Sequence, residues 1–231
     1  MKKRSKVPVR TKGMVQLHDQ LVDRIVSNTP PVKPVTSVFA QWSIWLALST
    51  GVMVLFLVNF HLQTGADQIL GQMPPLAFLI TAYLGAALAA WEAVASSVPG
   101  RQTGKGYKVL SLLVLGALIF VPFAFFYPSG AVFDVWGSFV NGMECVQRVC
   151  LVGLLPWIYL GRRLSRNASF SPAWTGAWSG VSAFLLGTVT VQLHCPSWDA
   201  RHMVSAHLLP VLFLIFFTTF IGSYWFGRWR K

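Results

Sequence analysis

Cysteine and histidine side chains stand where strongly apolar stretches of this sequence end. Cys150 lies near the start of one stretch, His194 and Cys195 close the next, and His207 lies near the start of the last. Thiolate and imidazole together are common ligands of zinc and other soft metals, and two thiols can form a disulfide. These four residues are therefore the candidates for sensing a redox or metal signal. His202 is interpreted as an ordinary interfacial residue.

The partner of Cys195 is left open by the spacing of the other two thiols. Cys145 and Cys150 are five residues apart, so on a helix their side chains point about 140° from each other. They cannot easily bond to each other or both face Cys195, so one is its partner and the other is spare. Three interpretations remain: a structural disulfide, a redox or metal-responsive sensor, and buried unpaired thiols. The candidate metal ligands are Cys150, Cys195 and His194.

The composition is that of an integral membrane protein. The 231 residues are 54% hydrophobic and only 11% charged, and the mean hydropathy is +0.56. Soluble domains average about 25% charged residues. The net charge of +12 is expected from basic loops beside anionic lipid, so direct binding of nucleic acid is not predicted.

Six segments are predicted to cross the bilayer as helices, each needing about 20 mostly apolar residues. The fourth is the weakest and is extended outward through Met143, which places Glu144 and Arg148 at its mouth. The segments are Phe39–Phe60, Leu76–Val98, Val109–Tyr127, Met143–Gly161, Ala173–Leu193 and Val204–Gly227.

The cations predict the orientation of these segments. Only Arg148 and Arg201 fall in loops on one side, so 17 of the 19 Lys and Arg residues fall on the other. The positive-inside rule places both termini in the cytoplasm. The fold class is therefore an all-α membrane protein with six transmembrane helices. The thiols lie on the non-cytoplasmic side, which in a bacterium is the periplasmic side of the inner membrane.

A polar, basic tail of residues 1–37 precedes the membrane domain of residues 38–231. Leu17, Leu21 and Ile25 recur at intervals of four residues, which predicts a short amphipathic helix. Such a helix is too short to form a core alone. We expect its apolar stripe to bind a groove on a cytoplasmic partner, the alternative being the membrane surface.

The motifs of membrane enzymes and pumps are missing from the sequence. It has no Cys-x-x-Cys pair, no nucleotide-binding loop, no paired carboxylate site and no chain of intramembrane charges. No catalytic residue is predicted, and no cofactor except a transient metal ion at the periplasmic cysteines and histidines. A small metal-handling or transporter-like membrane protein is the alternative function.

About 80 residues from Cys150 onward carry a series of short motifs in a fixed order. They are Cys150-Leu151, Leu155-Pro156, Gly161-Arg162-Arg163, Ser171-Pro172-Ala173, Leu193-His194-Cys195-Pro196, His207-Leu208-Leu209-Pro210 and Gly227-Arg228-Trp229. In these motifs the chain resembles the NrsF family, bacterial six-helix membrane anti-sigma factors, and Leu193-His194-Cys195-Pro196 is the most specific part of the resemblance. The first three segments match in hydropathy alone, and residues 17–35 are similar to the family's cytoplasmic leader.

The resemblance implies a role in transcription regulation during stress. A sigma factor of the extracytoplasmic-function class is the implied partner, held at the membrane until a signal arrives. The resemblance also implies that the cysteines matching Cys150 and Cys195 sense metals or oxidants. Cys145 then stands out as a possible additional thiol.

Overall fold

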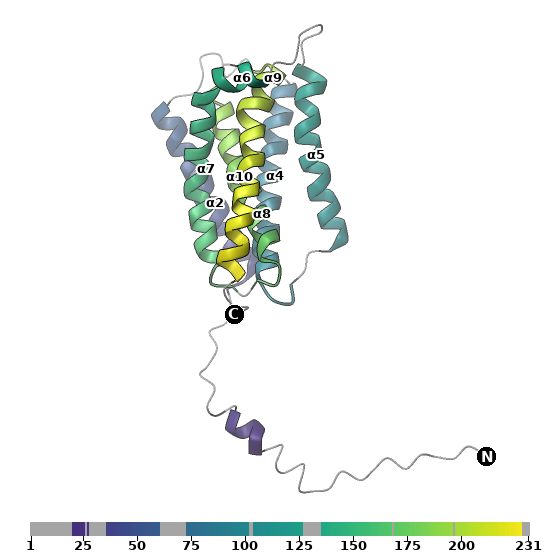
Figure 1. Ribbon diagram of the computed structural model, residues 1–231, viewed down its shortest axis with the longest axis vertical. Helices are drawn as coiled ribbons and strands as arrows, with labels where there is room; N and C mark the ends of the chain where they lie inside the picture. The colour runs from purple at the N-terminus through teal and green to yellow at the C-terminus, as the bar shows by residue number, and fades with distance from the viewer. Residues whose placement is uncertain are drawn as a thin grey trace, which may run out of the picture. The chain divides into compact units, whose positions relative to one another are not determined.

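The computed structural model describes residues 20–25, 27, 36–60, 73–101, 104–126, 135–167, 169–195 and 197–227. Within these ranges every regular element is a helix. The chain divides into two units, Met1–Val35 and Thr36–Lys231. In the first unit residues 20–25 are helical, and Leu21, Val22 and Ile25 are exposed. The second unit is the helical bundle of Figure 1.

A long helix occurs at each of the six predicted segments, and successive long helices run in opposite directions (Figure 1). The short helix α6 lies between α5 and α7, and the last long helix changes from α-helix to π-helix and back. The elements are α2 (Val38–Phe60), α4 (Met73–Ser97), α5 (Lys105–Phe126), α6 (Val135–Asn141), α7 (Met143–Leu164), α8 (Pro172–Gln192), α9 (Ala200–His202), η1 (Met203–Leu208) and α10 (Leu209–Trp225).

Four helices in the described part of the chain, not the six expected, are long and apolar enough to cross a membrane. They are α2, most of α4, α7 and the continuous helix Ala200–Trp225. Helix α5, some of whose side chains lie outside the described residues, is not among the four, and neither is α8.

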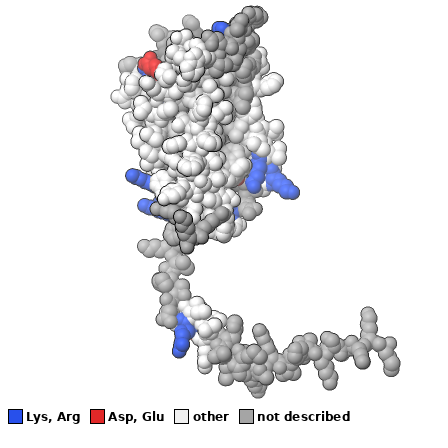
Figure 2. Space-filling model, viewed as in Figure 1, with Lys and Arg blue, Asp and Glu red and all other residues white. Residues whose placement is uncertain are grey.

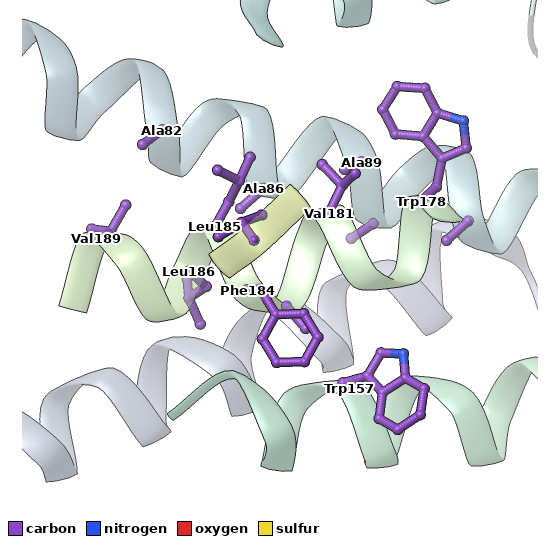
Figure 3. Packing of buried hydrophobic residues seen from close by; sticks show 14 of the residues in the cluster. Ala82, Ala86, Ala89, Trp157, Trp178, Val181, Phe184, Leu185, Leu186 and Val189 are labelled. Carbon is purple, nitrogen blue, oxygen red and sulfur yellow. The ribbon is translucent and has the colours of Figure 1, made fainter. Parts of the chain in front are cut away.

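The composition of α8 follows from its position at the centre of the bundle. It packs against α4, α7 and α10, and every residue from Trp178 to Gln192 is buried. Val181 and Leu185 pack toward the small residues of α4, and Phe184 points toward α7 (Figure 3). A helix enclosed by other helices needs close packing more than lipid-soluble side chains, so glycine, serine and threonine replace larger apolar residues.

Glycines allow α8 to approach its neighbours closely. A Cβ on Gly187 would lie 2.7 Å from the Val149 carbonyl oxygen of α7. A Cβ on Gly176 would lie 2.8 Å from the Cα of Gly222 on α10. Gly176 therefore lies on a packing face within the chain, where backbones approach each other directly.

The two ends of the bundle differ in their charge. Arg162 and Arg163 lie in the last turn of α7, and Lys105 begins α5. Figure 2 shows Lys and Arg side chains at this end, which we call the basic end. Helices α6 and α9 cover the opposite end (Figure 1).

A buried polar network joins three segments at the basic end. The Asn167 side-chain amide donates to Ser97 Oγ at 2.7 Å and to Gln41 Oε1 at 3.4 Å. The Gln41 amide donates in turn to the Thr36 carbonyl at 2.8 Å. The network therefore connects the start of α2, the end of α4 and the loop between α7 and α8.

Candidate functional site

Two thiols and two imidazoles lie together at the end of the bundle covered by α6 and α9. Ligand atoms of Cys145, Cys195, His202 and His207 all lie within 4.8 Å of one another. We call these four residues the Cys–His cluster. The Cys145 and Cys195 Sγ atoms are 3.7 Å apart, and Cys195 Sγ lies 3.2 Å from His202 Nε2. The cluster joins the first turn of α7, the segment after α8 and the start of the last long helix.

The segment that carries Cys195 is fixed by hydrogen bonds on both sides. The Cys195 backbone N–H donates to the Val191 carbonyl at 2.8 Å, which extends the end of α8. The Gln192 side-chain amide donates to the Ser197 carbonyl at 3.0 Å. Asp199 caps α9 by accepting from the Arg201 backbone N–H at 2.8 Å. The thiol is therefore held by a defined connection and not by a long loop.

The π-helical turn η1 aligns the two histidines of the cluster. His202 and His207 are five residues apart, and in an α-helix their side chains would diverge by about 140°. A π-helix bonds each residue to the one five positions away, so residues with this spacing lie one turn apart on the same face. Their rings are accordingly 5.2 Å apart between centroids. The His207 carbonyl accepts from the Thr188 hydroxyl at 3.2 Å, which ties the turn to α8.

Glycine at the start of α7 makes room for one of these rings. Gly142 is the N-cap residue of α7, and a Cβ there would lie 3.1 Å from the His202 ring. The same Cβ would collide with Ala206 of η1. The backbone between α6 and α7 thus lies directly against the cluster, and a larger residue at this position would displace it.

The environment of Cys195 favours its thiolate. The Cys145 thiol donates a hydrogen bond to Cys195 Sγ, which lowers the pKa of Cys195 from 9.0 to about 7. Burial opposes this shift, and the Ser197 backbone and the Arg148 charge add to it. Arg148 itself pairs with Glu144 and lies over the Phe60 ring. Cys195 therefore carries more thiolate near neutral pH than an ordinary cysteine.

His207 is the most enclosed member of the cluster. Its side chain is fully buried, and neither Nδ1 nor Nε2 makes a hydrogen bond of ordinary geometry in the described chain, although the Cys145 thiol interacts with the ring. Buried polar atoms without partners are rare in folded proteins because each costs about 1–3 kcal/mol. The imidazole of His207 is therefore either an expensive core residue or a ligand.

The structure groups the predicted site residues differently from the expectation. It brings Cys145 to Cys195, whereas Cys150 lies outside the cluster, half-buried on α7. His194 is also outside the cluster and lies edge-on to the Phe56 and Phe60 rings at 6.3 Å. Cys150 cannot reach the cluster partly because it lies about 7.5 Å further along the axis of α7 than Cys145 does.

His202 is a residue whose position the sequence interpretation missed. It was expected at the interface without a special partner, and it instead contacts Cys195 directly. One signal could have found the thiol pair. Cys195 lies just beyond the end of α8, so a partner thiol must come from the first turn of α7, where Cys145 lies. The histidines gave no comparable signal, because their five-residue spacing fits one face only if the helix contains a π-turn.

A comparison with protein families covers nearly the whole chain. The model of the NrsF family, described as negative regulator of sigma F, matches residues 25–229. The chain belongs to the NrsF family. No curated protein and no solved structure matches the chain. The NrsF match includes α2, α4 and α5, where the sequence resemblance rested on hydropathy alone.

The NrsF family description makes a sigma factor the partner of its members. Of the predicted partner-binding residues, Leu17 lies outside the described residues. Leu21 lies within the short tail helix of residues 20–25, and Ile25 lies at its end. Their side chains are 58% and 59% exposed.

Proposed function

We propose that this NrsF protein is a membrane-bound anti-sigma factor that holds an extracytoplasmic-function sigma factor at the bacterial inner membrane. A redox or metal stress signal in the periplasm acts on Cys145 and Cys195 and releases the sigma factor. The family match over residues 25–229 is the observation that carries this proposal. The grouping of two thiols and two imidazoles at the end opposite the basic end adds the sensing part.

The orientation in this proposal rests on the distribution of charge. Arg101, Lys105, Arg162 and Arg163 belong to the loops and helix ends at the basic end. The positive-inside rule then assigns this end, both termini and the tail to the cytoplasm. The Cys–His cluster faces the periplasm, where disulfides persist. The helices assigned to cross the bilayer are α2, most of α4, α7 and the continuous helix Ala200–Trp225, and α8 packs against α4, α7 and α10.

The tail helix is the proposed contact with the sigma factor. Leu21, Val22 and Ile25 are each between 41% and 59% exposed and present apolar surface on this helix. A short amphipathic helix of this kind gains stability when its stripe enters a groove on another protein. The basic residues that precede it in the sequence would add long-range attraction to an acidic partner.

The path from the cluster to the cytoplasm runs along packed helices. The cluster links α7, the end of α8 and η1, and α8 packs against α4, α7 and α10 over its length. Oxidation of the two thiols to a disulfide would pass two electrons and two protons to an oxidant and shorten the 3.7 Å sulfur separation to about 2.05 Å. The resulting shift of α7 against α8 then changes how the helix ends are arranged at the basic end. Coupling between sites of about 1–3 kcal/mol is enough to change partner affinity 5- to 150-fold.

The test is a pull-down of the full chain in mild detergent, with identification of the bound soluble protein. Wild-type protein should retain a sigma factor, and Leu21→Glu should lose it because a carboxylate enters an apolar contact. Gln20→Glu adds the same charge to the neighbouring exposed position and should retain the partner. Equal retention by Leu21→Glu and Gln20→Glu would exclude the stripe as the contact.

The signal is tested with the same complex. Oxidant or Cd²⁺ added to the purified complex should release the sigma factor from wild-type protein. Cys145→Ser and Cys195→Ser should each abolish the response to oxidant, whereas Cys150→Ser should respond normally. A response that depends on Cys150 and not on Cys145 would contradict the assignment.

A further inference from the structure

The geometry points to a tetrahedral site for a thiophilic divalent cation such as Zn²⁺ or Cd²⁺, formed by Cys145, Cys195, His202 and His207. This inference deepens the proposed function, on which it rests for its regulatory meaning. It adds two histidine ligands to the thiols and limits the charge and geometry of the ion. Binding itself can be measured on the purified chain without a sigma factor.

The distances in the cluster match those of a tetrahedral site. Zn–S bonds of about 2.3 Å place two thiolate ligands about 3.8 Å apart, and a thiolate and an imidazole nitrogen about 3.5 Å apart. The structure has 3.7 Å between Cys145 and Cys195 and 3.2 Å between Cys195 and His202 Nε2. All four ligand atoms lie within 4.8 Å of one another, so small side-chain rotations close the coordination sphere.

The charges also balance for a divalent ion. Two thiolates and two neutral imidazoles around a doubly charged cation give a net charge of zero. A neutral site is required here because Cys195 and His207 are buried and an unpaired charge would be costly. The neighbouring Arg148–Glu144 pair is itself neutral overall, although the Arg148 charge favours the Cys195 thiolate. A monovalent ion would leave the same ligand set with an excess negative charge.

His207 supplies the observation that favours a cation over a disulfide. Its fully buried ring has two nitrogens without a hydrogen bond of ordinary geometry in the described chain, and it interacts with the Cys145 thiol. A disulfide between Cys145 and Cys195 would consume that thiol and leave both nitrogens unpaired. A cation would bind one of them directly and remove that cost. A cation site would also explain the π-turn that carries His207, because this turn brings the His207 ring to the face that carries His202.

The consequence of binding is a crosslink between three parts of the bundle. The cation would join α7 through Cys145, the end of α8 through Cys195, and the last long helix through His202 and His207. It would also hold both thiolates as ligands, so a bound ion protects them from alkylation and oxidation. Cys150 lies outside the cluster and should stay reactive.

Co²⁺ is the probe because its spectrum reports both ligand type and geometry. The full chain in detergent, reduced and then freed of reductant, is titrated with CoCl₂. We expect one ion per chain, a thiolate-to-cobalt charge-transfer band and the intense visible bands of tetrahedral Co²⁺. Zn²⁺ and Cd²⁺ should displace Co²⁺ stoichiometrically and remove the visible bands.

The variants separate this site from its neighbours. Cys145→Ser, Cys195→Ser, His202→Ala and His207→Gln should each weaken binding by more than about 100-fold, beyond the effect of losing an outer-shell partner. Cys150→Ser and His194→Ala are the matched controls at the same end of the bundle, and both should bind as wild type does. Circular dichroism and gel filtration identify any variant that fails to fold. If one cysteine or one histidine variant fails to fold, the other variant of the same residue type decides whether that ligand is needed.

Three results would overturn the inference. The first is a wild-type chain that gives no charge-transfer band at one equivalent of Co²⁺. The second is a charge-transfer band without the visible bands of tetrahedral Co²⁺. The third is wild-type affinity for Co²⁺ in both histidine variants. None of these results bears on retention of the sigma factor, which the pull-down measures separately. If the wild-type chain bound cobalt as expected but retained no sigma factor, the proposed function would be refuted and the metal site would still be supported.

Discussion

The contact between α7 and α8 should control the distance between Cys145 and Cys195. Gly187 of α8 lies against the Val149 carbonyl of α7, one helical turn from Cys145. In Gly187→Ala the new Cβ would lie 2.7 Å from that oxygen, whereas ordinary contacts begin at 3.4 Å. The clash is with backbone, so α7 must move away from α8 by roughly 0.7 Å. The sulfur atoms should separate as a result.

The size of the effect follows from the cost of overpacking. Inserting a methyl group into a close-packed contact costs about 1–3 kcal/mol. Replacing glycine by alanine in a helix gains up to about 1 kcal/mol, which offsets part of this cost. Gly51→Ala is the matched control, since Gly51 is also helical and has nothing within 4 Å of its added Cβ. The difference between the two variants therefore isolates the clash.

The assay follows disulfide formation and thermal unfolding in detergent. A Cys150→Ser background leaves two thiols, and a maleimide gel shift counts those that survive treatment with oxidant. Gly187→Ala should oxidise several-fold more slowly than the parent, and its Tm should fall by several degrees. Gly51→Ala should oxidise at the parent rate with an unchanged or higher Tm. If Gly187→Ala matched Gly51→Ala in both rate and Tm, the α7–α8 contact would not position the thiols.

Three further predictions test other parts of the protein. A reporter fused after Lys231 should be active only in the cytoplasm, and periplasmic activity would reverse the proposed orientation. In whole cells, oxidant should protect Cys145 and Cys195 from alkylation while Cys150 stays alkylatable, as measured by mass spectrometry of the labelled peptides. Asn167→Ala should lower the free energy of unfolding by about 1–3 kcal/mol, measured by thermal unfolding, because it leaves buried partners unpaired.

The long helices could be predicted from hydropathy because lipid demands apolar side chains along an entire span. The same rule fails to describe α8. Thr188, Thr190 and Gln192 of α8 are fully buried. Their side chains donate to the carbonyls of His207, Leu186 and Ser197 respectively instead of facing lipid. A sequence shows the composition of such a helix but not its neighbours, so its central position could be found only from the packing.

The identity of the thiol pair depended on packing in the same way. Periodicity established that Cys145 and Cys150 face different directions, but only the placement of α8 beside α7 decides which of them meets Cys195. The histidines required more, because a π-turn leaves no regular sequence signal. In an uninterrupted α-helix His202 and His207 would point apart, and the four ligand atoms could not converge.

The π-turn is therefore the feature on which the geometry of the Cys–His cluster depends. It places the buried ring of His207 beside His202 while α10 continues beyond it into the core. An extra residue in a helix weakens its hydrogen bonding, and such turns occur frequently at functional sites. If deleting Ala206 restored a regular α-helix, His207 would rotate away and Co²⁺ binding would be lost although both thiols remain. Retention of tetrahedral Co²⁺ by a folded deletion variant would show that the turn is not needed for the site.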